Sequence, residues 1–517
     1  MILNSSKVPI KELFNINLGF LFLLIIGFFI TINSFTRNEC NQNFQIIQNS
    51  EQINSDIFNA LHRYDISQKV LNKTSNENTA LTLYQPFIYI GFTRSFWILD
   101  FSSSSYYNIN ATLLSMGENC YVYMEDLCIA ELGESAANEK TRYICEEFDN
   151  TIYHKVITLA GHPDGTLGDI DGDQKIIIVV SLNPISYYDQ RNELNLDYSN
   201  MCEMFYIYYN TWIPTIAHEF YHLIWFNNEM DEPHYTLEAL AEYSEFYTGY
   251  LAPYNNLTPQ SKLFLGNPED SLLYWNMLNS IDYGGVYLFA FYIAEHYGIE
   301  ILQNLITEPT DGAYGIENVL HRAGFNITFN ELYLNWITAL SLDELGFESN
   351  IYGFKNLDAH VSKYTLITRS SFNNKIKLYY YGFNVHKFKF PSNEFTIEIR
   401  KNSDITIGLS IAFYDIFGWH IYKDLNNKGI RTITENISGS EIDELYLITS
   451  YIFDRTPPLP SENGLGPFTY IEIIIYDKIL DLYISFLKIL GSFTLILIII
   501  IITTKRKHSL KNQNKKS

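Results

Sequence analysis

The chain has 517 residues and a hydrophobic content of 47%, which allows roughly two to four domains with apolar cores. Its formal net charge of −23 argues against nucleic acid as a partner, because a phosphate-binding surface needs clustered Lys and Arg. No such cluster occurs in the body of the chain, and the 40 Tyr favour β structure in part of it.

The N-terminal residues carry the pattern of an export signal. Lys7 and Lys11 precede an apolar run at 18–32, as in a secretory signal peptide or a short signal-anchor. No small-residue cleavage site follows this run, so both alternatives stay open for residues 1–35.

A second apolar run lies near the other end of the chain. Residues 484–504, which include SFTLILIIIIITT, have the length and composition of a transmembrane helix; a buried core helix is the weaker alternative. The basic residues of 505–517 belong on the cytoplasmic side by the positive-inside rule. We therefore expect a protein of the cell membrane whose residues between the two runs lie outside the cytoplasm.

The five cysteines agree with export. None has the CxxC spacing of a zinc ribbon, and outside the cytoplasm one or two disulfides are expected. Cys120, Cys128 and Cys145 are the simplest partners, whereas Cys40 and Cys202 lie far from them in sequence.

Between the two apolar runs, the pattern changes twice. Residues 40–150 mix a polar helical start with strand-like runs, and we interpret them as an N-terminal accessory or propeptide-like region. Residues 151–345 contain long helical patterns. Residues 350–480 alternate apolar and polar positions between turn signals, as in FTIEIRK and YIEIIIY, which predicts an antiparallel β-sandwich.

The pentad HEFYH, residues 218–222, is a candidate metal site. Thr211 as N-cap and Pro214 in the first turn predict a helix that places His218 and His222 one turn apart on one face. Glu219 then lies beside that face, where it can act on a metal-bound water without being a ligand. The same pentad also arises by chance in chains of this composition, so its surroundings decide.

A third ligand is expected, because catalytic zinc usually has three protein ligands and one open position. The stretch YTLEALAEYSEFYTGY, residues 235–250, predicts a second helix on which Glu238 and Glu242 share a face. We take Glu238 as the ligand. The alternative HExxHxxGxxH pattern fails, because Trp225 and Asn228 occupy its Gly and His positions.

HExxH followed by a helix with EALAEY resembles the gluzincin zinc metallopeptidases, in which the second helix often reads NEGxAEY. Leu237 and Ala239 replace the usual Asn and Gly, but the ligand is kept. The likeness is closest to secreted hyicolysin-like bacterial and archaeal proteases and covers roughly 164–345. It includes GDIDGDQKIIIVVSLN, YSNMCEMFYI and YGGVYLFAFYIAEHYG, in that order. The flanking regions lie outside it.

The resemblance implies an α+β, thermolysin-like catalytic domain, with a mixed-sheet subdomain and a helical subdomain. The C-terminal β-sandwich and the transmembrane helix would follow it. It also implies that Glu242 orients a zinc histidine from behind. Related enzymes stabilise the oxyanion with a downstream Tyr or His. Tyr283 is the first candidate here, Tyr287 the second and His234 a weaker third, while His296 is expected to be structural.

Three aspartates resemble the start of a calcium-binding loop. Asp169, Asp171 and Asp173 have the right spacing, but Gln174 and Val180 stand at the sixth and twelfth positions, so the rest of an EF-hand is missing. They could bind a structural Ca²⁺ or serve as turn carboxylates before the following strand.

These patterns predict a membrane-anchored, extracytoplasmic zinc endopeptidase that acts on proteins or peptides, with Glu219 as general base. One alternative is a degenerate peptidase fold used as an adhesin, but the pentad and Glu238 are intact. Another is a zinc aminopeptidase, although no motif for a free N-terminus, such as GxMEN, precedes the pentad.

Overall fold

The structure is a computed structural model of the whole chain. The expected signal segment 1–35, membrane helix 484–504 and basic tail 505–517 all lie outside the residues that it describes. None of the helices in the described part is long and apolar enough to cross a membrane. The described residues are 88–165, 169–229, 232–252, 255–276, 279–344, 350–368, 371–389, 392–442, 444–455, 457 and 466–477.

The described residues fall into two compact units, of which Leu99–Ser105 is the small one. Its residues 101–104 form a tight turn held by Asp100, whose carboxylate accepts hydrogen bonds from the Ser102 backbone N–H at 2.9 Å and from Ser103 Oγ at 2.7 Å. The remaining described residues form the second unit.

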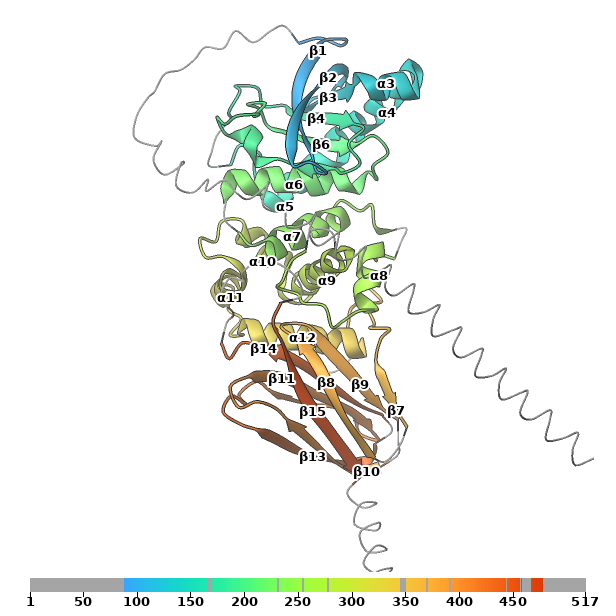
Figure 1. Cartoon of the computed structure of the whole chain (residues 1–517), viewed down its shortest axis with the longest axis vertical. Helices are drawn as coiled ribbons and strands as arrows, with labels where there is room; N and C mark the ends of the chain where they lie inside the picture. The colour runs from blue at the N-terminus through green and yellow to red at the C-terminus, as the bar shows by residue number, and fades with distance from the viewer. Residues whose placement is uncertain are drawn as a thin grey trace, which may run out of the picture. The chain divides into compact units, whose positions relative to one another are not determined.

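A mixed six-stranded sheet begins the second unit, in the order β1-β2-β3-β4-β6-β5 (Figure 1). The pairs β3–β4 and β4–β6 are parallel, while β2–β3 and β5–β6 are antiparallel. All six residues of β4 (IIIVVS) are buried, as expected for a central strand covered on both faces. The strands are β1 Thr93–Asp100, β2 Ser105–Met116, β3 Cys120–Glu125, β4 Ile176–Ser181, β5 Tyr187–Tyr188 and β6 Met204–Tyr208.

The domain boundary expected at residue 150 falls inside a run of helix. Helix α4 (Glu134–Glu147) passes into a π-helical turn (Phe148–Ile152) and then into α5 (Tyr153–Ala160). A short helix, α3 (Asp126–Leu132), precedes them. Strands before and after this run share one sheet, so β1, β2 and β3 belong to the same sheet as β4 and β6.

Seven helices, counted in the described residues, follow β6 and form the helical region. Close packing of α8 on α9 needs Gly284, because a Cβ there would lie 2.1 Å from the Gln260 carbonyl oxygen. A capping box of Thr328 and Glu331 starts the last helix. The helices are α6 Pro214–Asn228, α7 His234–Tyr247, α8 Pro259–Leu265, α9 Ser280–Tyr297, α10 Ile299–Leu305, α11 Gly312–Arg322 and α12 Phe329–Leu342.

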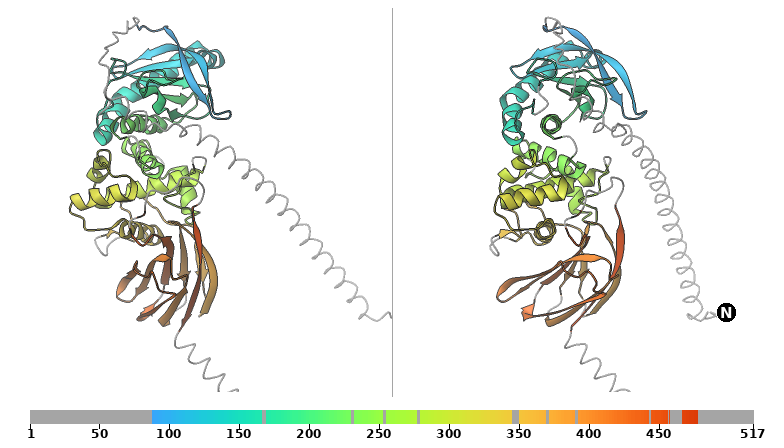
Figure 2. Two further views of the ribbon diagram at one scale, coloured as in Figure 1. Left: turned by 60° about the vertical axis from the view of Figure 1, so that its left-hand side comes forward. Right: turned by 90° about the vertical axis from the view of Figure 1, so that its left-hand side faces the viewer.

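Two sheets form the C-terminal part, which is coloured orange to red in Figure 2. Their strand orders are β13-β10-β15-β8 and β12-β11-β14-β9-β7. Their pairs are antiparallel except β7–β9. One apolar core joins them, with Ile397 and Ile473 from the first sheet and Leu447 from the second. The strands are β7 Thr365–Ile367, β8 Ser371–Tyr379, β9 Phe383–Phe388, β10 Ser392–Arg400, β11 Thr406–Asp415, β12 Gly418–Asp424, β13 Thr432–Ile442, β14 Glu444–Ile452 and β15 Phe468–Asp477.

Helix α12 lies beside strands β11 and β14 and covers the outer face of their sheet (Figure 1). Thr338 Oγ1 donates to Ser410 Oγ at 3.0 Å, and the hydroxyls of Tyr333 and Ser450 are 3.1 Å apart. The α+β class, with a mixed sheet, a helical region and C-terminal antiparallel sheets, is therefore confirmed.

Candidate metal centre

Helix α6 presents the two histidines as the spacing predicts. Pro214 occupies its first turn, where the missing N–H leaves no intrahelical bond unmade. The N-cap is Ile213 rather than Thr211, so that detail of the prediction was wrong. The Thr211 hydroxyl instead lies 3.1 Å from Ser186 Oγ, and the helix begins later in the chain, at Pro214.

Three ligand atoms from two helices meet at one point. His218 Nε2 lies 3.1 Å from His222 Nε2 and 3.1 Å from Glu238 Oε2, and His222 Nε2 lies 3.4 Å from the same oxygen. Atoms that share one tetrahedral zinc at about 2.0–2.1 Å stand about 3.3–3.4 Å apart. The side chains of His218, His222 and Glu238 therefore have the donor types and the spacing of a three-ligand zinc site.

The Glu238 carboxylate gives an independent test of that fit. Its Oε2 is buried and receives no hydrogen bond of acceptable geometry within the described residues, although the two imidazole nitrogens are close. Burial would raise the pKa of Glu238, but His222 and His218 outweigh it and hold that pKa well below its usual range. A buried anionic oxygen that receives no hydrogen bond is unfavourable in the protein alone, and a bound cation would compensate its charge.

His218 is held from behind by a second carboxylate. Glu242 Oε1 lies 3.6 Å from His218 Nδ1, which leaves Nε2 facing Glu238. Burial opposes a charge on His218, yet Glu238 and the neighbouring carboxylates raise its pKa to about 10. The sequence analysis predicted that Glu242 orients a zinc histidine, and the structure places its carboxylate beside His218.

A competing ligand set shares His218. Its members are His218, Glu242 and Glu245, which offer only one nitrogen. Burial raises the pKa of Glu245 to about 7, and burial together with the Glu245 charge raises that of Glu242 well above its usual value. Two carboxyl groups that disfavour ionisation make weaker ligands, so the set with two histidines and Glu238 fits a metal better.

Glu219 is buried on α6 directly after the first histidine. Burial raises its pKa, while the charges of His218 and His222 act in the opposite direction. A buried carboxylate with a raised pKa beside a metal-ligand set has the properties of a general base.

The three candidates for the oxyanion donor have different surroundings in the structure. Tyr283, on α9, has its ring centroid 6.5 Å from that of His218 and packs against Trp275. Tyr287 donates its hydroxyl to the Asn256 carbonyl oxygen at 2.5 Å and is fully buried, which fits a structural role. His234 begins α7, one turn before Glu238.

His296 lies in a structural setting, as expected. Its Nε2 is 3.0 Å from the Gly353 carbonyl oxygen, and its ring packs on Tyr292 and Phe354. Burial lowers its pKa, so the neutral ring is favoured.

The three aspartates before β4 do not act as one set. Asp169 and Asp171 gather with Glu203, at the start of β6, whereas Asp173 accepts hydrogen bonds from Tyr121 Oη at 2.9 Å and the Lys175 backbone at 3.2 Å. Sequence reasoning missed Glu203, although it lies in the quoted run YSNMCEMFYI. The spacing of residues along one loop cannot show a carboxylate that arrives from another strand.

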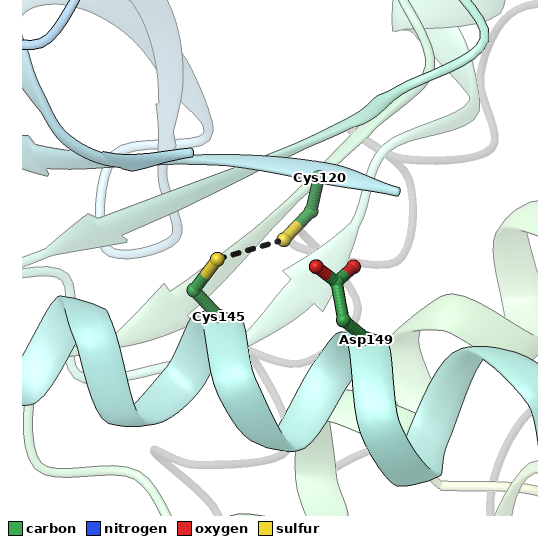
Figure 3. Close-up of side chains that lie close together, drawn as sticks. All are labelled: Cys120, Cys145 and Asp149. Carbon is green, nitrogen blue, oxygen red and sulfur yellow. Dashed lines mark hydrogen bonds between the residues drawn. The ribbon is translucent and has the colours of Figure 1, made fainter. Parts of the chain in front are cut away.

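Among the cysteines, Cys120 and Cys145 come together, with their sulfur atoms 3.7 Å apart (Figure 3). Asp149 points toward the same place from the next helical turn, but its oxygens accept hydrogen bonds from the backbone N–H groups of Glu118 and Asn119. Cys120, Cys128, Cys145 and Cys202 are all buried free thiols in the structure. Of the pairings that the sequence left open, only Cys120 with Cys145 has a sulfur–sulfur contact among the described residues.

No protein-family model and no curated protein matches this chain. Among solved structures, it is similar to the pre-peptidase C-terminal domain of a collagenase from Bacillus anthracis, at 14% identity and a TM-score of 0.15, over 22% of this chain and 94% of that one. It is also similar to the GH115 glucuronidase BtGH115A, at 6% identity and a TM-score of 0.14, over 51% of this chain and 38% of that one. These low TM-scores leave the function to be inferred from the residues of the site.

Proposed function

We propose that the chain is a zinc-dependent endopeptidase of the gluzincin type. One observation carries this proposal: the ligand atoms of His218, His222 and Glu238 lie 3.1–3.4 Å apart, beside a buried Glu219. Two imidazoles and one carboxylate leave a fourth position open, which is the arrangement of catalytic rather than structural zinc.

Each residue then has a defined task. Bound zinc would polarise the scissile carbonyl and lower the pKa of its water towards neutrality. Glu219 accepts the proton of the attacking water and passes it to the leaving amine. Glu242 keeps the His218 ring in the tautomer that faces Glu238. Tyr283 is the candidate that donates to the developing oxyanion.

The proposed substrates are proteins or peptides outside the cytoplasm. The apolar runs at 18–32 and 484–504 support a membrane anchor, and the basic residues at 505–517 support a cytoplasmic C-terminus. Nothing in the composition favours nucleic acid.

The test is zinc content and casein cleavage, measured together on wild type, Glu219→Gln and a control variant. Glu300→Gln is a matched control, because Glu300 is exposed on α10, away from the cluster. We expect about one zinc per chain in all three, with cleavage lowered roughly 10²–10⁴-fold only in Glu219→Gln. Full cleavage by Glu219→Gln would contradict the mechanism.

Peptides with blocked ends separate the two hydrolase hypotheses. An endopeptidase cleaves a peptide that is acetylated and amidated, whereas an aminopeptidase needs the free amine. Folded protein that binds no zinc would instead favour the adhesin alternative.

A further inference from the structure

A second group of carboxylates lies away from the His/Glu cluster, where the loop before β4 meets the start of β6. Asp169, Asp171 and Glu203 each offer an oxygen within 4.8 Å of the other two. Oxygens that share one calcium ion at about 2.3–2.6 Å can lie up to about 5 Å apart. The spacing suits one ion, but spacing alone does not identify a site.

Glu203 supplies the observation that points to a ligand. Its side chain is buried, with 3% exposed, and its Oε1 accepts a hydrogen bond from the Ile170 backbone at 2.7 Å. Its Oε2 is also buried and has no hydrogen-bond partner in the described part of the chain. A buried carboxylate oxygen left without a donor is costly, and a bound cation would remove that cost.

The charges around Glu203 point the same way. Glu193, another buried carboxylate, lies close enough to Glu203 and Asp171 to interact with their charges. Arg94 is the cation that acts on Asp171, and it also donates to the Asn200 carbonyl oxygen. Carboxylates therefore outnumber the guanidinium around this group.

We propose that Asp169, Asp171 and Glu203 form a calcium site. An oxygen-only ligand set with a net negative charge is the set that Ca²⁺ takes, whereas zinc prefers nitrogen and sulfur. Asp173 is not part of this group, and its two oxygens accept hydrogen bonds from Tyr121 and from the Lys175 backbone.

The site is connected to the helix that carries HEFYH. Asn227, near the end of α6, interacts with the Glu193 carboxylate and donates to the Pro163 carbonyl oxygen at 2.8 Å. A Cβ at Gly165 would lie 2.3 Å from the Asn227 carbonyl oxygen, so the chain at Gly165 runs directly against the helix. Calcium bound at Glu203 would thus stabilise the end of α6 beyond His222.

The experiment is a calcium titration of the full chain, with Ca²⁺ alone as the probe and both binding and thermal unfolding as readouts. Wild type should bind about one Ca²⁺ and unfold at a higher temperature in its presence. Glu203→Gln should weaken binding at least ~10-fold. Asp197→Asn, which removes an exposed carboxylate from a neighbouring loop, should behave as wild type.

Two comparisons keep the test decisive. In calcium-free buffer, Glu203→Gln should unfold at the same temperature as wild type or higher, because it removes charge repulsion; if it does not fold, Asp169→Asn makes the same test. His222→Ala should keep its calcium response, which separates this site from the proposed zinc site. Wild-type affinity in Glu203→Gln, no saturable binding by wild type, or an equal response to Mg²⁺ would overturn the proposal.

Discussion

The helical region and the C-terminal sheets bury charged groups in opposite ways. Between α6 and α7, Glu219, Glu238 and Glu242 crowd around two histidines and raise or lower one another's pKa. In the sheets, the buried Lys401 amine donates to two backbone carbonyl oxygens, of Ile405 and Asn427, at 2.7 and 2.8 Å. The helical region thus gathers several buried charges in one place. In the sheets, the buried Lys401 charge is compensated by hydrogen bonds to nearby backbone.

The difference shows where the chain accepts a cost in stability. Buried like charges are unfavourable unless a cation or a proton compensates them. The core shared by the two sheets instead gains stability from burying Ile and Leu, at roughly 25 cal/mol per Å² of apolar surface. The helical cluster thus keeps a cost in stability that a bound metal ion would offset, whereas the core of the sheets adds to stability.

Removing a ligand should have the largest effect. We expect Glu238→Ala to lose zinc and, with it, all measurable hydrolysis, because two histidines alone hold the ion weakly. Metal analysis after dialysis, combined with casein cleavage, tests this. Zinc retained at one per chain would show that the Glu242 and Glu245 set is the ligand set instead.

The next largest effect should come from the oxyanion donor. Tyr283→Phe removes one hydroxyl and should lower kcat by about 10²–10³-fold, with zinc content unchanged. Tyr287→Phe is the matched control, because its hydroxyl donates to Asn256 and should matter only for stability. If kcat falls in Tyr287→Phe but not in Tyr283→Phe, the assignment is wrong.

A core change in the sheets should affect stability without affecting the metal. Ile473→Ala deletes a fully buried side chain and should lower the free energy of unfolding by about 2–5 kcal/mol. Ile416→Ala, at a position 67% exposed, is the control and should change it little. Denaturant unfolding and zinc content, measured on the same samples, test the contrast. Loss of zinc from folded Ile473→Ala would contradict it.

The smallest effect is expected from a change at Glu242, the carboxylate beside His218. Glu242→Gln should weaken zinc affinity by about 10–100-fold, because the amide orients the His218 ring less strongly than a carboxylate does. Competition with a chelator measures this affinity. An affinity equal to that of wild type would mean that Glu242 has no part in holding His218.

Patterns close together in sequence determined much of this protein. The four-residue spacing of His218 and His222 fixed their common helix face, because helix geometry is local. Alternation of apolar and polar residues in FTIEIR gave the buried positions of β10, including Ile397 and Ile399. The acidic pair on the second helix followed from the same periodicity, together with the resemblance to gluzincins.

Contacts between distant segments were decided only by the tertiary structure. Glu203 joins Asp169 across 34 positions because β6 pairs with β4, and no local pattern shows which strands will pair. The same reason explains why residues 93–125 join the sheet of β4 and β6, and why Cys145 faces Cys120 rather than Cys128. Helix and strand periods are set by the backbone, whereas the partners of a buried side chain are set by the packing of the whole core.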